Sequence, residues 1–195
     1  SLSRRPCRPY DKERDGLSLG EGAGAVILAV DKSNLPVLAT IKGWAVTNDA
    51  NHITGPSRTG EGLKVAMKKA LNMAQMTPEQ IDYINGHGTG TIYNDEMEAQ
   101  AIGTVFEKSL PPVTSMKGYF GHTLGAAGTI ETGLCLMAMR ENTIPACLGF
   151  ERLGVDKPIN VPAEHLKHNL TNVLTIKCGF GGVNAAVILG SPRML

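Results

Sequence analysis

Apolar positions recur with two spacings along the chain, and the spacing separates helices from strands. Between residues 59 and 75, apolar side chains fall at helical intervals with lysines on the opposite face, which predicts an amphipathic helix. Two further helices are predicted at 94–106, where Asn94 and Asp95 are candidate caps, and at 126–140. The last is apolar nearly all round, as is typical of a buried helix. Short runs rich in β-branched residues predict strands at 37–46, 81–84, 111–115, 173–178 and 185–189.

The order of these elements indicates the fold class. Strands and helices alternate along most of the chain, which ends with two strands joined by the glycine hairpin GFGGVN (179–184). Such alternation predicts an α/β fold with a mainly parallel sheet and helices on both faces. Residues 1–15 are polar and are predicted to form an extended surface lead-in. A turn is predicted at 34–36, and 143–162 is predicted to be irregular.

The glycine-rich stretch 16–24 introduces a short apolar run. A dinucleotide-binding loop must precede a helix, whereas here Val26, Ile27 and Val30 follow and favour a strand. We therefore reject a dinucleotide site and predict a glycine-lined approach to a buried strand.

Composition limits the classes of protein to which the chain can belong. At 195 residues it suits one domain, or one half of a larger two-lobed protein, and 42% hydrophobic residues allow a real core. With 19 basic against 18 acidic residues, the net charge of +1 gives no reason to expect nucleic acid or an anionic membrane as a partner. No apolar run is long enough to span a membrane, and no secretory signal is visible. The four cysteines are far apart without a CxxC pair, which favours free thiols and a reduced, cytoplasmic setting.

Two glycine-rich loops carry candidate chemistry. The stretch IDYINGHGTGT (81–91) reads as a strand end followed by a loop that contains His87, and KGYFGHTLGAAGTIE (117–131) repeats this order around His122. Glycine lets a backbone approach a ligand closely. If the two strands are neighbours in a parallel sheet, both loops lie at its carboxyl edge and both imidazoles face one cleft.

A pair of neutral imidazoles beside a lysine suits chemistry in which negative charge develops on oxygen. Each imidazole can donate one N–H to an oxyanion or enolate, and Lys117 and Glu131 flank the second histidine. A tight turn with a satisfied histidine is the simpler alternative for the first loop alone. Zinc is disfavoured because neither histidine belongs to an HxxxH or HExxH pair, and a serine hydrolase because no GxSxG occurs.

Four motifs in register resemble the C-terminal half of the β-ketoacyl-acyl carrier protein synthases. They are RPYDKERDGLSLGEGAG (8–24), HGTGT (87–91), KGYFGHTLGAAG (117–128) and GFGGVN (179–184). The resemblance covers nearly the whole chain and implies a thiolase-like fold, in which two similar halves pack in five αβαβα layers. It also implies that residues 1–195 are a C-terminal ketosynthase domain and that the half bearing the nucleophile is absent.

The resemblance implies roles for the residues of the two loops. His87 and His122 match the two histidines that drive decarboxylation of the malonyl carrier and hold the resulting enolate. Lys117 matches the lysine that orders that site together with an acid, and Glu131 and Asp95 stand at the corresponding acid positions.

Further matches concern the substrates and partners. Thr89 and Thr91 match threonines that bond the phosphopantetheine arm, and Phe180 resembles the gating phenylalanine whose backbone N–H contributes to the oxyanion hole. The implied activity is a Claisen condensation of an acyl thioester with malonyl-carrier, in fatty-acid or related polyketide or polyene synthesis. The resemblance implies no metal and no cofactor other than the arm on the carrier. The implied partners are acyl carrier protein, the N-terminal half of the same synthase and a second copy in a homodimer.

The chain also departs from the family pattern. The family nucleophile is a cysteine at a strand-to-helix turn, and none of the four cysteines has that setting, so we expect no nucleophile here. Phe120, Cys178 and residues 145–150 differ from the usual residues near the acyl pocket, which leaves the acyl chain length open. The alternatives are a chain-length factor, disfavoured by retention of both histidines and Lys117, and a carrier-binding, non-catalytic partner.

Overall fold

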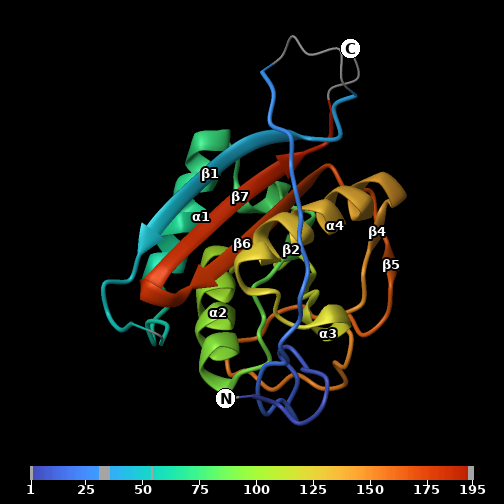
Figure 1. The fold of residues 1–195 in the computed structure, drawn as a ribbon. Coiled ribbons are helices and arrows are strands. Elements are labelled where there is room, and N and C mark those ends of the chain that lie inside the picture. Colours follow the sequence, from blue (N-terminus) through green and yellow to red (C-terminus); the bar gives the residue numbers. More distant parts are fainter. Residues whose placement is uncertain (1, 31–35, 54, 193–195) are drawn as a thin grey trace.

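The computed structural model describes residues 2–30, 36–53 and 55–192, and its centre is a five-stranded sheet (Figure 1). The strands lie in the order β1-β7-β6-β2-β3. Their bounds are Thr40–Asn48 (β1), Tyr83–Asn85 (β2), Val113–Thr114 (β3), Asn172–Gly179 (β6) and Val183–Gly190 (β7). β6, β2 and β3 pair in parallel, whereas β7 is antiparallel to both of its neighbours. All strands except β7 therefore run in one direction, which confirms the predicted mainly parallel sheet.

Helices cover both faces of this sheet (Figure 1). The three long helices are α1 (Glu61–Ala74), α2 (Ile92–Val105) and α4 (Ala127–Glu141). Successive side chains of a strand point to opposite faces. Ile84 accordingly packs in the core cluster shared with α1 and α2, and its neighbour Tyr83 packs in the cluster that includes Cys135 and Met139 of α4. The predicted α/β class and the three predicted helices are confirmed.

The remaining elements are short. They are the 3-10 turns η1 (Pro78–Gln80), η2 (Leu124–Ala126) and η3 (Phe180–Gly182), the helix α3 (Lys117–Phe120), and the strand pair β4 (Thr143–Ile144) and β5 (Leu166–Lys167). Most of 143–162 is irregular, as predicted. The turn predicted at 34–36 falls largely outside the described residues. Over the described ranges, no helix has the length and apolar character needed to cross a membrane.

The N-terminus of α2 differs from the prediction. Thr91 is the N-cap residue, so Asn94 and Asp95 lie inside the first turn and do not cap it. Their side chains are buried, because that turn packs against the loop that follows β2. The Asp95 carboxylate accepts the backbone N–H groups of this loop, which a cap residue would not reach.

The prediction of an extended surface lead-in at residues 1–15 was wrong. Tyr10 is fully buried, and Asp11 and Arg14 are buried with it. Burial of these polar groups is tolerated because they have partners. The Asp11 carboxylate accepts the N–H groups of Glu151 and Arg152, and the Tyr10 hydroxyl donates to a carboxylate of α2.

The buried strand predicted at 26–30 was also wrong. This stretch is extended but pairs with no strand among the described residues, and Ile27, Leu28 and Val30 are 81%, 74% and 88% exposed. In Figure 1 it continues the blue segment that passes in front of α4. The pattern identified an apolar stretch correctly, but among the described residues this stretch joins no sheet.

The all-round apolar pattern of α4 corresponds to burial on one face only. Cys135, Ala138 and Met139 are buried against the sheet, whereas Met137 is half exposed. The opposite face is therefore open around Met137, whereas Gly22 and Gly24 lie against the start of the helix.

We expect Gly43→Ala to destabilise the fold, because β1 lies directly on α1 at this position. A Cβ at Gly43 would collide with the backbone oxygen of Ala70 and would come within 2.9 Å of the backbone nitrogen of Ala74. A clash with backbone atoms requires a shift of the helix, which costs about 1–3 kcal/mol.

The matched control is Gly133→Ala in α4, where a Cβ meets nothing within 4 Å. This change should stabilise the fold by about 0.5–1 kcal/mol, because alanine favours a helix interior over glycine. Urea unfolding of both variants measures the two free energies. Equal stability of the two variants would contradict the close packing of β1 on α1.

Candidate active site

Three parallel strands bring the candidate residues to one edge of the sheet. β2 leads to His87, β3 leads to Lys117, and β6 leads to Phe180. Neighbouring parallel strands end on the same side, and α/β proteins commonly bind ligands at that side. The predicted placement of both glycine-rich loops at the carboxyl edge is therefore observed.

The structure brings the two histidines together. The ring centroids of His87 and His122 are 5.2 Å apart, and the ring planes meet at 83°. His87 is buried, whereas His122 is partly exposed. The backbone N–H of Leu124 donates to Nδ1 of His122 at 3.0 Å, so the proton of the neutral ring lies on Nε2. His122 thus presents a fixed N–H donor.

Both imidazoles are neutral at physiological pH. Burial lowers the pKa of His87 well below its usual value of 6.5, and the ammonium group of Lys117 lowers it further. Burial also lowers the pKa of His122 to about 4, with Lys117 again the second cause. A neutral pair donates hydrogen bonds without offering an acidic proton, which is the behaviour that an enolate-binding site needs.

Lys117 is fully buried and joins the two loops. Its Nζ lies 2.8 Å from Oε1 of Glu131 and donates to the backbone oxygen of His87 at 2.6 Å. Burial raises the pKa of Glu131, but Lys177 and Lys117 outweigh this and hold that pKa below its usual value. The pKa of Lys117 is lowered by burial, while Glu131 counteracts the shift. Glu131 therefore neutralises a lysine that positions His87.

Asp95 lies apart from Lys117 and holds the loop backbone instead. Its Oδ1 accepts the N–H groups of Thr89 at 3.1 Å and Gly90 at 3.2 Å, and its Oδ2 accepts the N–H of Tyr10. Its ion pair is with Arg14, at 3.8 Å. Of the two predicted acids, only Glu131 forms an ion pair with Lys117.

Glu98 belongs to the site but was missed in the sequence. Its carboxylate accepts the backbone N–H groups of His87 and Gly88 and the hydroxyl of Tyr10. Burial raises the pKa of Glu98 to about 7. The sequence signal was its spacing of three residues from Asp95, which places both acids on the same face of α2.

The two threonines of HGTGT lie in the same loop as His87. The Oγ1 atoms of Thr89 and Thr91 are 2.9 Å apart, and Thr89 is buried while Thr91 is partly exposed. Gly88, between His87 and Thr89, has a φ of 33°, and a Cβ there would lie 2.5 Å from the Cβ of Ser115. Glycine is therefore required for this loop to pack on the loop after β3.

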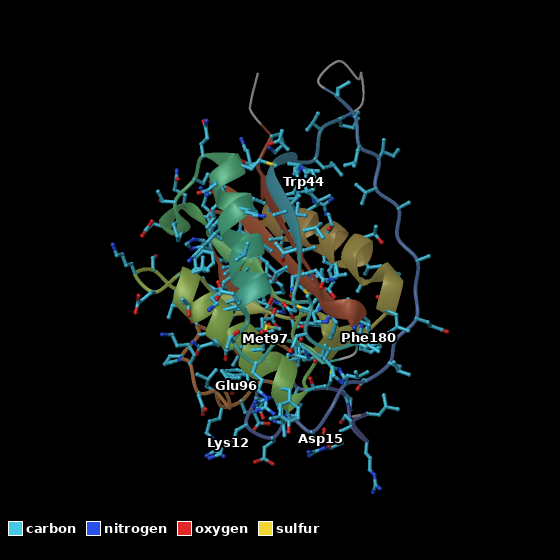
Figure 2. The ribbon with its side chains drawn as sticks, turned by 90° about the vertical axis from the view of Figure 1, so that its left-hand side faces the viewer. Lys12, Asp15, Trp44, Glu96, Met97 and Phe180 are labelled. Atoms are coloured by element: carbon cyan, nitrogen blue, oxygen red, sulfur yellow. The ribbon has the colours of Figure 1, made fainter. Side chains whose placement is uncertain are left out.

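Phe180 occupies the turn between β6 and β7, where Figure 2 labels it at the end of the hairpin. Its side chain is 76% exposed in this conformation. Gly181 has a φ of 81°, and its N–H donates to the oxygen of Ile53 at 2.6 Å. The turn is thus anchored on one side of Phe180 while the ring itself is unrestrained by packing.

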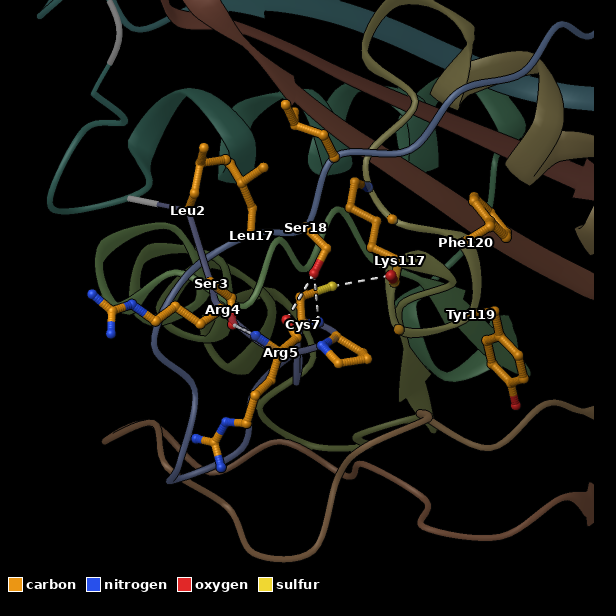
Figure 3. A pocket seen from close by; sticks show the side chains of 14 residues that line it. Leu2, Ser3, Arg4, Arg5, Cys7, Leu17, Ser18, Lys117, Tyr119 and Phe120 are labelled. Atoms are coloured by element: carbon orange, nitrogen blue, oxygen red, sulfur yellow. Dashed lines mark hydrogen bonds between the residues drawn. The ribbon is translucent and has the colours of Figure 1, made fainter.

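A pocket of about 470 Å³ lies between the N-terminal segment and α3 (Figure 3). It is lined by residues 2–7, 17–19 and 117–121, and neither His87 nor Thr89 reaches it. Cys7 lies in this lining and donates to the backbone oxygen of Lys117 at 3.0 Å. The pocket therefore shares Lys117 with the candidate site but is lined by neither histidine.

The four cysteines are free thiols. Burial raises the pKa of Cys7 and of Cys178, and it raises the pKa of Cys135 and of Cys147 to about 12. A thiol must lose its proton to act as a nucleophile. None of them is a thiolate at neutral pH. Within the described part of the chain, no cluster of three His, Cys, Asp or Glu side chains is arranged to hold a metal ion.

We predict that His122 titrates with a midpoint of about 4. At pH 5.5 it should be neutral, whereas an unperturbed histidine with a pKa of about 6.5 is mostly protonated. The reason is burial next to Lys117 and Lys177, which Glu131 offsets only in part. Imidazole nitrogen shifts in NMR spectra measure the midpoint, and His122→Gln identifies the resonance.

The same shift links the stability of the fold to pH. Below pH 6.5 the unfolded chain binds a proton at His122 that the folded chain does not bind until about pH 4. Stability present above pH 6.5 should therefore fall as the pH drops towards 4, and His122→Gln should weaken this dependence. A midpoint of 6.5 in the wild type would disprove the burial argument.

Comparison with known proteins agrees with this geometry. Residues 38–151 match the family model described as beta-ketoacyl synthase, C-terminal domain. The 3-oxoacyl-[acyl-carrier-protein] synthase 2 of Coxiella burnetii is 40% identical over 190 residues, which are 93% of this chain and 46% of the relative. A putative polyketide beta-ketoacyl synthase 1 of Streptomyces halstedii is 33% identical over 95% of this chain and 46% of its own length.

Solved structures give the same result. A chain of the ishigamide ketosynthase/chain length factor superposes with a TM-score of 0.93 at 32% identity, over 98% of this chain and 48% of that one. A beta-ketoacyl synthase from Burkholderia phymatum superposes with a TM-score of 0.85 at 29% identity, over 95% of this chain and 46% of its own. The chain thus spans less than half the length of the proteins that it matches. The thiolase-like fold is confirmed, and the chain belongs to the β-ketoacyl synthase family, in which it corresponds to the C-terminal domain.

Proposed function

We propose that this chain forms the enolate-binding part of a decarboxylating β-ketoacyl-acyl carrier protein synthase. The observation that carries the proposal is the pair of neutral imidazoles 5.2 Å apart at the carboxyl edge of the sheet. The reaction is a Claisen condensation of an acyl thioester with malonyl-carrier, in fatty-acid synthesis or a related polyketide or polyene pathway.

In this reaction the bond between the malonyl carboxylate and the α-carbon breaks and carbon dioxide leaves. The electron pair of that bond delocalises onto the thioester oxygen, where His122 Nε2–H and His87 are the proposed donors. The enolate carbon then attacks the carbonyl of an acyl thioester held on a cysteine, and the cysteine sulfur leaves as thiolate. Removing one donor of this kind raises the activation free energy by about 3–4 kcal/mol.

Neutrality of the two rings supports this assignment. An imidazolium would protonate the enolate carbon and waste the malonyl unit, whereas a neutral N–H stabilises the oxygen and leaves the carbon nucleophilic. Lys117 contributes its charge without touching the substrate, because its Nζ is bonded to Glu131 and to the oxygen of His87. Lys117 and Glu131 are therefore proposed as positioning residues.

The proposed substrates arrive on an acyl carrier protein, whose phosphopantetheine arm would bond Thr89 and Thr91. The partly exposed Thr91 and its 2.9 Å contact with Thr89 suit a polar arm that enters from solvent. The names of the curated relatives include the acyl carrier protein, which supports the same partner. No further cofactor and no metal are proposed.

The acyl group needs a thiolate that these four thiols do not provide. We propose that the N-terminal half of the synthase supplies it and packs on the open face of α4, and that the complete synthase is a homodimer. A chain-length factor is the second candidate, because chain-length factors occur among the structural neighbours. The two neutral histidines and Lys117 favour the synthase.

In the complete synthase, consisting of this chain and the N-terminal half, His87→Ala or His122→Ala should lower release of carbon dioxide from malonyl-carrier by about 100- to 1000-fold. Each change removes one donor to the enolate oxygen. Radiolabelled malonyl-carrier measures the release, and mass spectrometry of the acyl-enzyme measures transfer of the acyl group.

Acyl transfer should persist in at least one of these variants, because the proposed thiol lies on the other half. His168→Ala is the control, since His168 is exposed and lies just before the amino end of β6, at the opposite edge of the sheet. Decarboxylation at the wild-type rate in both histidine variants would refute the assignment. A wild type that never releases carbon dioxide would favour the chain-length factor.

Phe180→Ala should raise unproductive decarboxylation relative to condensation. The exposed ring between Gly179 and Gly181 can swing without strain, and a gate that opens only after acylation would set the order of the two substrates. Product analysis gives the ratio of condensed to decarboxylated malonyl-carrier. A wild-type ratio would eliminate the gate.

A further inference from the structure

Lys177 is a lysine at the carboxyl end of β6 that the proposed chemistry does not use. Residues of β6 alternate between the two faces of the sheet, and Lys177 shares the α4 face with Thr175. Its side chain is only 18% exposed. A lysine held this far from water needs partners for its charge.

Four oxygens surround the Lys177 ammonium. Oε2 of Glu131 lies at 2.7 Å, Oδ1 of Asn85 at 2.8 Å, the backbone oxygen of Ile176 at 2.8 Å and that of Gly86 at 3.5 Å. These oxygens belong to α4, β2, β6 and the loop before His87. A single ammonium therefore connects α4, β2 and β6 with the loop that leads to His87.

Glu131 is shared between two lysines, and each lysine also reaches the loop after β2. Lys117 donates to Oε1 of Glu131 and to the backbone oxygen of His87. Lys177 forms an ion pair with Oε2 of Glu131 and contacts the backbone oxygen of Gly86. Consecutive carbonyl groups of the loop are thus held by consecutive members of one charged network. Loss of either ammonium would free one side of the turn that aims His87.

We propose that Lys177 is a positioning residue whose ammonium acts as a built-in cation, filling an oxygen cage that orders the Asn85–His87 turn. This inference rests on the proposed function, because its activity measurement assumes that the complete synthase decarboxylates malonyl-carrier. Lys177 touches no reacting atom in this proposal. It acts through Glu131, Asn85 and Gly86 on the orientation of His87.

An oxygen cage predicts different outcomes for two replacements of Lys177. Lys177→Ala leaves the four oxygens around an empty space the size of the lost ammonium, which external ammonium can refill. Lys177→Met keeps a side chain of similar length in that space and removes only the charge. Ammonium should therefore rescue the alanine variant and not the methionine variant.

In the complete synthase, both variants should release carbon dioxide from malonyl-carrier about 10- to 100-fold more slowly than the wild type, the usual loss when an orienting partner is removed. Ammonium chloride should restore most of this rate in Lys177→Ala only. Tetramethylammonium chloride at equal ionic strength is the salt control, because that ion is too large for the cage. Lys69→Ala, an exposed lysine of α1, is the residue control.

The melting temperature gives a readout that does not depend on activity. It should fall in both variants and should rise with ammonium chloride in Lys177→Ala alone. A wild-type rate in Lys177→Ala, or equal effects of ammonium on the alanine and methionine variants, would overturn the cage. A wild type without decarboxylation would refute the proposed function instead, and the melting series would still decide on the cage.

Discussion

The candidate site depends on one buried carboxylate that faces two ammonium groups. Glu131 on α4 pairs with Lys117 at 2.8 Å and with Lys177 at 2.7 Å, and its side chain is inaccessible to solvent. Removing one partner of such a buried network typically costs about 3–5 kcal/mol, because the remaining charge is left without compensation. The network carries one excess positive charge, which helps to keep both neighbouring imidazoles unprotonated. A single arrangement thereby fixes the geometry and the protonation state of the histidines.

The location of the site followed from the sequence because it depends on local rules. A glycine-rich loop after a strand can be recognised in the amino-acid sequence, and parallel strands that end at one edge of a sheet bring such loops together. His87 and His122 were therefore paired correctly from two separate stretches. Lys117 and Glu131 were also associated correctly, since both lie within the second loop and the start of its helix.

The parts that the sequence did not reveal depend on contacts between distant segments. Tyr10 looked like part of a polar surface segment, but its hydroxyl reaches Glu98, 88 residues away, and both are buried. Asp95 looked like a helix cap, although its carboxylate holds the backbone of the preceding loop. Residues 26–30 have the composition of a buried strand, and composition does not reveal which sheet provides the neighbouring edge. The predicted strand at 173–178 contains Lys177, but nothing in the sequence indicated its partners.

The bond between Asn85 and Lys177 has a consequence for how the protein is made. These residues are 92 positions apart, and Lys177 is one of the last residues to leave the ribosome among those that form the site. Contacts of such long sequence separation form late in folding, because a long loop must close first. During synthesis, the turn that carries His87 therefore emerges well before the ammonium that holds it. A nascent chain has the histidine without its orientation, so the proposed ability to stabilise an enolate would arise abruptly when β6 joins the sheet.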